Sequence, residues 1–204
     1  MFAWRIKEKN KTMTEKRTVG KPPIVIAGTN TKIRNTGAEV SIGKRTVLGD
    51  FIVIYSGCVI GTKCLIGDGA KIRNDARIGN NCIVGMNTKI GAHTRIGNNV
   101  RIMDLCNIAG YTIIEDNVFI AQGTMFVNDN YMIHRATCGD NDDQYGVGPR
   151  ICSGASIGAN STILAGIVVG ENSIVGAGSV LTKNVPVGEM WFGNPAKFIK
   201  KLDI

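Results

Sequence analysis

Histidine, aromatic residues and long apolar runs are all scarce in this 204-residue sequence. Its two histidines are His93 and His134, and aromatic residues make up 6% of the chain. No stretch of about eighteen apolar residues occurs, so we predict no membrane span. The cysteines do not follow the spacings of zinc sites, so we expect no metal. No nucleic-acid-binding motif is present either, so we expect no nucleic-acid partner.

Basic residues outnumber acidic ones by 24 to 16, which gives a net charge of +8. The first twenty residues are rich in lysine and arginine and contain no apolar run, which does not fit a secretory signal. We therefore predict that residues 1–22 form a disordered basic tail. Met13 is an alternative natural start within this tail.

An aliphatic residue returns at every sixth position over most of the chain. The series reads Ile42, Leu48, Ile54, Ile60, Ile66, Ile72, Ile78, Val84, Ile90, Ile96, Ile102, Ile108, Ile114 and Ile120, and it ends on Phe126. It resumes one residue out of phase as Ile151, Ile157, Ile163, Val169, Val175 and Leu181. A period of six fits neither an amphipathic helix nor a simple alternating strand. It indicates a repeat architecture instead.

The residue two places before most of these aliphatics is small or compact, as in Ala70, Cys82 and Thr94. Positions two apart share a face of an extended chain, so each unit is a short strand with one large and one small inward residue. Gly, Asn and Asp then follow, and these residues tolerate the left-handed backbone of a corner. Three units make a triangular turn of about eighteen residues, and stacked turns bury a continuous core.

This pattern resembles the left-handed parallel β-helix of the hexapeptide-repeat acyltransferase superfamily. The resemblance implies an all-β fold of about seven triangular coils with one protruding loop and a short C-terminal helix. We expect the β-helix at residues 23–185, with an inserted loop at 127–150. Residues 186–204 should form a capping segment whose helix begins at Asn194 and Pro195.

The cysteine positions also follow the six-residue repeat. Cys64 and Cys82 are eighteen residues apart and should stack in neighbouring coils. A disulfide between them is one alternative, but free core thiols in a cytoplasmic protein are favoured. Four of the six cysteines occupy the small inward position, namely Cys58, Cys64, Cys82 and Cys106.

The interruption between Phe126 and Ile151 is the main functional clue. Its Asp-, Asn- and Gly-rich sequence predicts a loop, and loops held by a rigid scaffold commonly carry chemistry. The string Asn128-Asp129-x-Tyr131 resembles the nucleotide-sugar N-acetyltransferases of the superfamily. In those enzymes the tyrosine continues directly into Pro-Arg, whereas here Met132-Ile133-His134 comes before Arg135. An exposed surface insert is the alternative interpretation.

The resemblance implies transfer of an acetyl group to the amino group of a nucleotide-linked deoxysugar used in surface glycans such as lipopolysaccharide. A loop histidine suits general-base catalysis, so His134 is the candidate base, with an exposed loop residue as the alternative. Asn128 and Asp129 would orient the acceptor or hold the base. Further candidates for substrate binding are Tyr131, Arg135, Asp104 and Asn107. His93 falls at a corner, where a solvent-facing turn residue is expected.

The C-terminal stretch is similar to the acyl-CoA end of the family, which implies acetyl-CoA as co-substrate and no metal. Small residues would let a pantetheine arm lie against strand backbone, and lysines would meet the cofactor's phosphates. The candidate cofactor-binding residues are Ala165, Gly166, Gly176, Ala177, Thr182, Lys183, Pro195 and Lys197.

The resemblance also implies a homotrimer with active sites between subunits. Two outward cation pairs, Arg77 with Arg95 and Lys71 with Lys89, should each stack on one face and either contact solvent or line such a cleft.

A sugar O-acetyltransferase remains an alternative, as does a non-catalytic β-helix scaffold. A γ-class carbonic anhydrase shares the prism but needs three zinc-binding histidines, and this chain has two.

Overall fold

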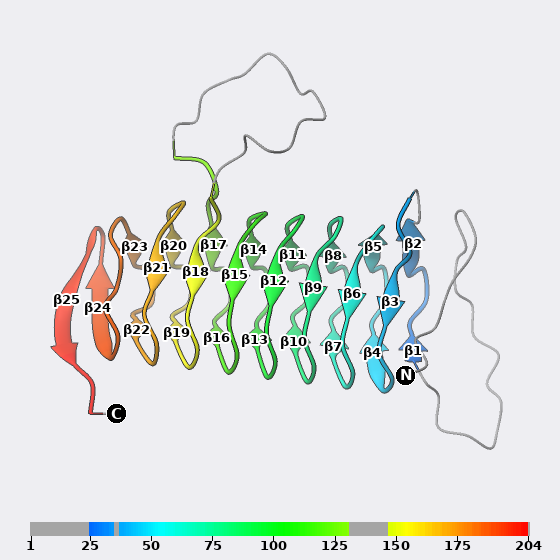
Figure 1. Ribbon diagram of the computed structural model, residues 1–204, viewed down its shortest axis with the longest axis horizontal. Coiled ribbons are helices and arrows are strands. Elements are labelled where there is room, and N and C mark those ends of the chain that lie inside the picture. The colour runs from blue at the N-terminus through cyan, green and yellow to red at the C-terminus, as the bar shows by residue number, and fades with distance from the viewer. Residues whose placement is uncertain (1–24, 35–36, 131–146, 204) are drawn as a thin grey trace, which may run out of the picture.

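The computed structural model describes residues 25–34, 37–130 and 147–203, and all regular structure in these ranges is β-strand. The strands coil into a parallel solenoid of about eight turns, the left-handed β-helix that the repeat resembles (Figure 1). In the described part of the chain, no helix has the length and apolar character needed to cross a bilayer.

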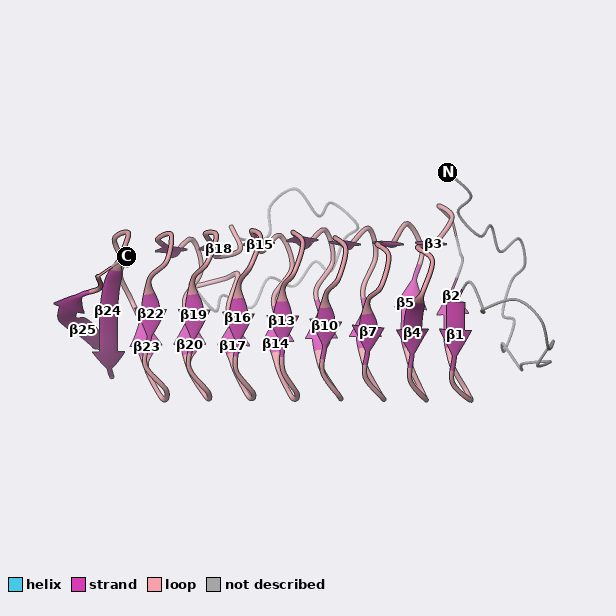
Figure 2. Ribbon diagram, turned by 90° about the horizontal axis from the view of Figure 1, so that it is seen from below, coloured by secondary structure: helices cyan, strands magenta, loops and turns pink. Residues whose placement is uncertain are grey.

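Three sheets form the faces of the prism, and each turn of the chain visits them in the same order (Figure 2). The ten-stranded sheet contains β1 (Val25–Ala27), β4 (Thr46–Leu48), β7 (Leu65–Ile66), β10 (Ile83–Val84), β13 (Arg101–Ile102), β16 (Phe119–Ile120), β19 (Ser156–Ile157), β22 (Ile174–Val175), β24 (Glu189–Gly193) and β25 (Ala196–Lys201). The eight-stranded sheet contains β2 (Lys32–Arg34), β5 (Val53–Tyr55), β8 (Lys71–Ile72), β11 (Lys89–Ile90), β14 (Asn107–Ile108), β17 (Met125–Phe126), β20 (Thr162–Ile163) and β23 (Val180–Leu181). The seven-stranded sheet contains β3 (Ser41–Ile42), β6 (Val59–Ile60), β9 (Arg77–Ile78), β12 (Arg95–Ile96), β15 (Ile113–Ile114), β18 (Arg150–Ile151) and β21 (Val168–Val169).

The inward aliphatic residues stack directly on one another from turn to turn. Ile90 pairs in register with Ile72 on one side and Ile108 on the other, and all three side chains are fully buried. The register survives the interruption, because Phe126 pairs with Ile163. The inserted segment therefore absorbs the one-residue change of phase without disturbing the core.

The corners show the left-handed backbone that the Gly, Asn and Asp residues predict. A residue with positive φ occurs at every sixth position from Arg45 to Gly123 and again from Gly154 to Gly178. Most of these residues are Gly or Asn, which adopt this conformation at low cost. The first series ends at the turn that precedes the insertion.

The prediction of a C-terminal helix was wrong. Residues 196–201 form β25, which pairs antiparallel with β24 in a hairpin at the end of the solenoid. The first hairpin strand pairs in turn with β22 through Met190 and Trp191. A strand satisfies the exposed backbone groups at the edge of a sheet, which a helix does not.

The number of turns was underestimated by about one. Strands β1 and β2 already belong to the prism, and Ile33 is buried in the core. Ile33 and Ile42 are nine residues apart, so the regular spacing of six begins only at Ile42 and does not include the first turn.

We expect the core column to dominate stability in the middle of the solenoid. Replacing Ile108 with Ala removes a fully buried side chain between two packed neighbours and should lower the free energy of unfolding by about 2–5 kcal/mol. Urea unfolding followed by circular dichroism measures this change. Ile113→Ala is the matched control in the same turn, because the Ile113 side chain is 40% exposed. Equal losses in the two variants would contradict the stacked-core interpretation.

Candidate active site

The inserted segment leaves the prism at the corner that joins the eight-stranded sheet to the seven-stranded sheet. We call this edge the loop-bearing corner; it comprises residues 73–75, 91–93, 109–111, 127–130, 164–166 and 182–184. Val127 donates its backbone N–H to the Ile163 carbonyl at 2.9 Å, so the chain is still in register when it leaves β17. Asn128 and Asp129 follow immediately.

Both ends of the insertion are fixed to the next turn. The Asn130 side-chain amide donates to the Ala165 carbonyl at 3.1 Å, and the Ala165 N–H donates to Asn130 Oδ1 at 3.0 Å. On the return side, the Gly166 N–H donates to the Val147 carbonyl at 2.8 Å. The predicted catalytic residues Asn128 and Asp129 are therefore held next to the predicted cofactor residues Ala165 and Gly166.

The returning chain also packs closely on the turn before the insertion. A Cβ atom on Gly148 would overlap the backbone of Tyr111 and Thr112. Only glycine permits this approach, so the return of the insertion is fixed against the same corner as its departure.

A histidine and a tyrosine stack on the loop-bearing corner below the insertion. The His93 and Tyr111 ring centroids are 4.9 Å apart with an interplanar angle of 21°. His93 Nδ1 lies 3.9 Å from Asp75 Oδ2 in the preceding turn. His93 was expected to be a solvent-facing turn residue. It does lie at a corner, with its side chain 36% exposed, and Tyr111 covers part of its ring.

The sequence contained a signal for this stack that we did not use. His93 and Tyr111 occupy the corner position with positive φ, at 57° and 61°, which Asn or Gly fills at many other corners. Bulky residues are rarely found in this conformation, and such residues cluster at functional sites. Arg45, Phe51, Lys63 and Leu105 occupy the same position at other corners. What distinguishes His93 and Tyr111 is that two aromatic rings eighteen residues apart stack on one corner, directly below the insertion.

Asn107 is the predicted substrate-binding residue with the most unusual surroundings. It faces outward on β14 and pairs with Met125 of the strand that leads into the insertion. Its Oδ1 is buried, and no hydrogen bond to it is present in the described part of the structure. A buried acceptor without a partner costs about 1–3 kcal/mol, so this oxygen favours a ligand that brings a donor.

Asp104 lies on the opposite edge of the eight-stranded sheet from the loop-bearing corner. Its Oδ1 accepts the backbone N–H of Met86 in the turn below at 2.7 Å. The structure therefore separates Asp104 from Asn128 and Asp129. Three further predicted site residues, Tyr131, His134 and Arg135, lie outside the described residues.

The predicted cofactor residues fall into two groups. Thr182 and Lys183 lie on the loop-bearing corner one turn beyond Ala165 and Gly166, because Leu164 donates its N–H to the Leu181 carbonyl. Among the described residues, no heavy atom comes within 4 Å of a Cβ built on Gly166, so they leave this part of the corner open.

The second group lies beside the C-terminal hairpin. Pro195 follows β24, Lys197 lies on β25, and the Gly193 N–H donates to Ser179 Oγ at 3.1 Å. Ala177 is exposed, whereas a Cβ on Gly176 would overlap the ring of Phe192. The hairpin therefore covers the backbone at Gly176, which was expected to face a pantetheine arm. Lys197 belongs to the ten-stranded sheet, whereas Gly176 and Ala177 lie at the corner that joins this sheet to β23 of the eight-stranded sheet.

One ion pair connects the turns on either side of the insertion. Arg150 donates from Nε and Nη2 to Glu115 Oε1 at 2.9 and 2.6 Å. The backbone N–H and hydroxyl of Ser153 donate to Glu115 Oε2 at 3.0 and 3.1 Å. Hydrogen bonding from Arg150 holds the pKa of the Glu115 carboxyl below its usual range.

The core cysteines are free thiols, as expected. Cys58, Cys64, Cys82 and Cys106 are buried, and burial raises the pKa of Cys58 to about 11. The hydrogen bond from the neighbouring Cys64 and burial both raise the pKa of Cys82. Within the described ranges, no three His, Cys, Asp or Glu side chains gather as a group able to hold a metal.

The repeat matches the family model described as bacterial transferase hexapeptide (six repeats). The matched residues are 39–74, 58–92, 93–128 and 148–183, which together span more than half of the chain. The matches stop at the base of the insertion and begin again where it ends. No curated protein is similar enough to the chain to match.

Several solved structures are similar to this chain. A hexapeptide transferase family protein from Anaplasma phagocytophilum has 23% identity over 84% of this chain and 84% of its own, with a TM-score of 0.47. A hexapeptide-repeat acetyltransferase from Vibrio cholerae O1 biovar eltor, in complex with acetyl coenzyme A, has 23% identity over 59% and 71%, with a TM-score of 0.45. The soybean serine acetyltransferase apoenzyme has 31% identity over 52% and 40%, with a TM-score of 0.42.

Removing the Asn130 amide should loosen the base of the insertion. Asn130→Ala deletes two hydrogen bonds to Ala165, and each is worth about 0.5–1.5 kcal/mol. We expect the amides of residues 165 and 166 to exchange with solvent about tenfold faster, as measured by hydrogen–deuterium exchange. Gln122→Ala, an exposed change at another corner, should leave these rates unchanged. Unaltered exchange in Asn130→Ala would contradict the anchoring role.

The Glu115–Arg150 pair should stabilise the protein near neutral pH and lose this effect in acid. The folded-state pKa of Glu115 is lowered, so the stabilisation is present above the ordinary glutamate pKa and is lost as the pH falls through the folded value. Glu115→Gln should therefore unfold at lower urea concentration than the unmodified protein at pH 7. The difference should shrink below about pH 4. A difference that is constant with pH would contradict this assignment.

Proposed function

Because this chain belongs to the bacterial transferase hexapeptide family, we propose that it is an acetyl-CoA-dependent acetyltransferase with a sugar acceptor. The observation that carries the proposal is the geometry of the loop-bearing corner. There the family repeat is interrupted, and Asn128 and Asp129 are held against Ala165 and Gly166 by the hydrogen bonds of Asn130. Residues suited to the acceptor and residues suited to the cofactor thus meet at one place.

The reaction joins an acceptor nitrogen or oxygen to the acetyl carbonyl carbon and breaks the thioester bond. The acceptor must lose a proton, the carbonyl oxygen must be stabilised as it gains negative charge, and the coenzyme A thiolate must gain a proton. We assign proton removal to His134, with Asn128 and Asp129 orienting it or the acceptor. His93 is a second candidate base, because it lies on the same corner with Asp75 Oδ2 3.9 Å from its Nδ1.

The acceptor that we propose is the amino group of a nucleotide-linked amino-deoxysugar, such as those incorporated into surface glycans. Tyr131 and Arg135 would contact its ring and phosphates, with Asp104 as a more distant contact. Asn107 is a further candidate contact, because its buried Oδ1 has no partner among the described residues and can accept a hydrogen bond from an amine or a hydroxyl. A sugar hydroxyl is the alternative acceptor.

We propose that acetyl-CoA lies along the last turns of the eight-stranded sheet. Ala165, Gly166 and Thr182 would contact the pantetheine arm, and the open space at Gly166 supports this placement. The exposed Lys183 and Lys197 would pair with its phosphates. Pro195 and Ala177 would contact the cofactor beside the hairpin, and Gly176 would do so only indirectly, because Phe192 covers it.

The proposed assembly is a homotrimer, which light scattering coupled to size exclusion tests directly.

The proposed activity predicts that acetyl-CoA binds to the purified protein and that acetyl transfer releases free thiol. Calorimetric titration measures the first, and a screen of nucleotide-linked amino sugars and hydroxyl-only sugars with thiol detection measures the second. A turnover confined to amino sugars would identify the amine as acceptor. No binding heat at millimolar acetyl-CoA would refute the proposal.

Variants of the two histidines separate the candidate bases. If His134 is the base, His134→Ala should lower kcat by about 10²–10⁴-fold while His93→Ala has a small effect. The reverse result would assign the base to His93. Asp129→Asn should reduce kcat with either base if Asp129 orients the reacting groups. Full activity in all three variants would contradict base catalysis from this corner.

A further inference from the structure

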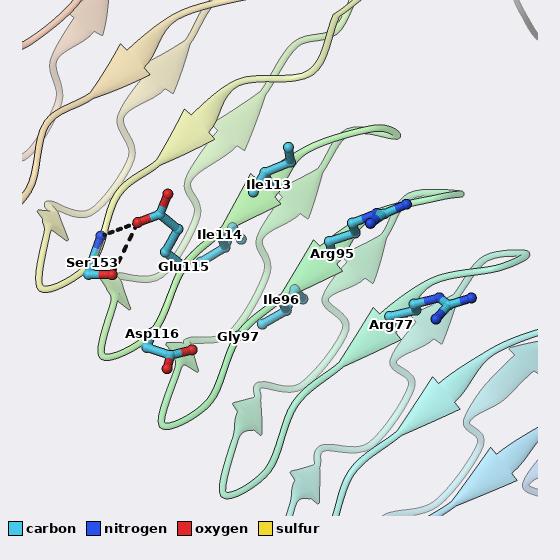
Figure 3. Close-up of a pocket in the computed structure, with 9 residues that line it drawn as sticks. All are labelled: Arg77, Arg95, Ile96, Gly97, Ile113, Ile114, Glu115, Asp116 and Ser153. Atoms are coloured by element: carbon cyan, nitrogen blue, oxygen red, sulfur yellow. Dashed lines mark hydrogen bonds between the residues drawn. The ribbon is translucent and has the colours of Figure 1, made fainter.

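A groove on the seven-stranded sheet contains two arginines that the described structure leaves without an acidic partner. It has a volume of about 440 Å³, which falls within the range of small-molecule sites. Arg77 and Arg95 project from neighbouring strands on the same side of the sheet, with Glu115 and Ser153 at the far end of the groove (Figure 3). Ile113 lies between these two ends.

The register of the strands brings the two cations close together. Arg95 pairs directly with Arg77, so their backbones are about 4.8 Å apart. Both side chains are exposed, and neither forms an ion pair or hydrogen bond within the described ranges. Two like charges on neighbouring strands repel one another, and an anion between them would relieve that repulsion.

The acidic residues of the groove are already engaged. Glu115 accepts four hydrogen bonds from Arg150 and Ser153, and Asp116 Oδ1 accepts the backbone N–H of Asn98 at 2.7 Å. Neither carboxylate neutralises Arg77 or Arg95 in the described structure. The free positive charge of the groove is therefore concentrated over strands β9 and β12.

We propose that Arg77 and Arg95 bind the diphosphate of the nucleotide-linked acceptor. Guanidinium groups donate pairs of parallel hydrogen bonds to phosphoryl oxygens, so two adjacent arginines match two linked phosphoryl groups. Ile113 is 40% exposed on the next strand and offers an apolar surface to the nucleoside. This inference rests on the proposed function for the identity of the ligand.

Arg95 lies at the end of the groove nearest to the loop-bearing corner, whereas the rest of the groove runs towards the opposite edge of the seven-stranded sheet. Arg95 follows His93 by two residues, so their Cα atoms are at most about 7 Å apart. In this proposal the sugar leaves the diphosphate at the Arg95 end and extends towards His93, Tyr111 and Asp129. The candidate cofactor residues lie on later turns, beyond β17 in the solenoid.

Calorimetry with inorganic pyrophosphate and with uridine diphosphate tests the site. Arg77→Gln and Arg95→Gln should each weaken binding of both probes by about tenfold or more. The matched controls are Lys71→Gln and Lys89→Gln, which remove the same charges from the same turns on the eight-stranded sheet. The control variants should bind both probes like the unmodified protein. Equal weakening by arginine and lysine variants would overturn the proposal in favour of general electrostatic attraction.

A second variant and a second ligand complete the test. Arg95→Lys keeps the charge but loses the paired donors, so it should bind pyrophosphate more weakly than the unmodified protein. Acetyl-CoA also carries a diphosphate, and its affinity should not change in Arg77→Gln or Arg95→Gln. Weaker acetyl-CoA binding with unchanged uridine diphosphate binding would overturn the assignment. The groove would then be a binding site for acetyl-CoA.

The outcome is separable from that of the proposed function. The Arg77→Gln/Arg95→Gln double variant could still transfer acetyl groups with an unchanged KM for the acceptor. This result would refute the proposed diphosphate site but not the acetyltransferase activity. Arginine-dependent pyrophosphate binding without any acetyl-CoA binding would support the anion site and refute the acetyltransferase.

Discussion

Register between successive turns is the constraint on which the whole molecule depends. Each short strand satisfies its backbone through the strands of the turns before and after it, which are eighteen residues away in the regular part, as when the Lys89 N–H donates to the Cys106 carbonyl at 2.9 Å. The same register stacks Ile90 on Ile72 and Ile108. A shift of one residue would move these side chains from the core to solvent. The six-residue repeat of the sequence is therefore required for both backbone pairing and core packing.

This constraint explains why the insertion lies at a corner. A corner can lose its regular path without breaking a ladder of strands, provided that the chain returns in register. Here the return is secured by Gly148 against Tyr111 and by the pairing of Ile151 with Ile114. The Glu115–Arg150 contact joins the same two turns from the outside. The scaffold thus fixes both ends of the insertion, which is how a rigid frame positions a loop.

The fold could be predicted from the sequence because the local six-residue repeat specifies it. Ile108 and Cys106 reveal their inward positions through spacing alone, and the structure confirms both. The secondary structure of the C-terminal segment could not be predicted in this way, because Asn194-Pro195 suits a helix start as well as a hairpin turn. Only the open edge of β22, a feature of the assembled solenoid, decides in favour of a strand. The Arg77–Arg95 stacking was predicted from spacing, whereas the isolation of these arginines from Glu115 depends on side-chain geometry that spacing does not contain.

The prism also limits what one subunit can do alone. A flat sheet face touches a ligand from one side, whereas small-molecule sites bury about 70–90% of a ligand's surface. Arg77, Arg95 and Ile113 all project from one such face. A nucleotide-linked sugar lying across it would need a second wall, which another copy of the chain would supply. The trimer that we propose has a physical reason in this geometry: a neighbouring prism would convert an open groove into a site that can exclude water.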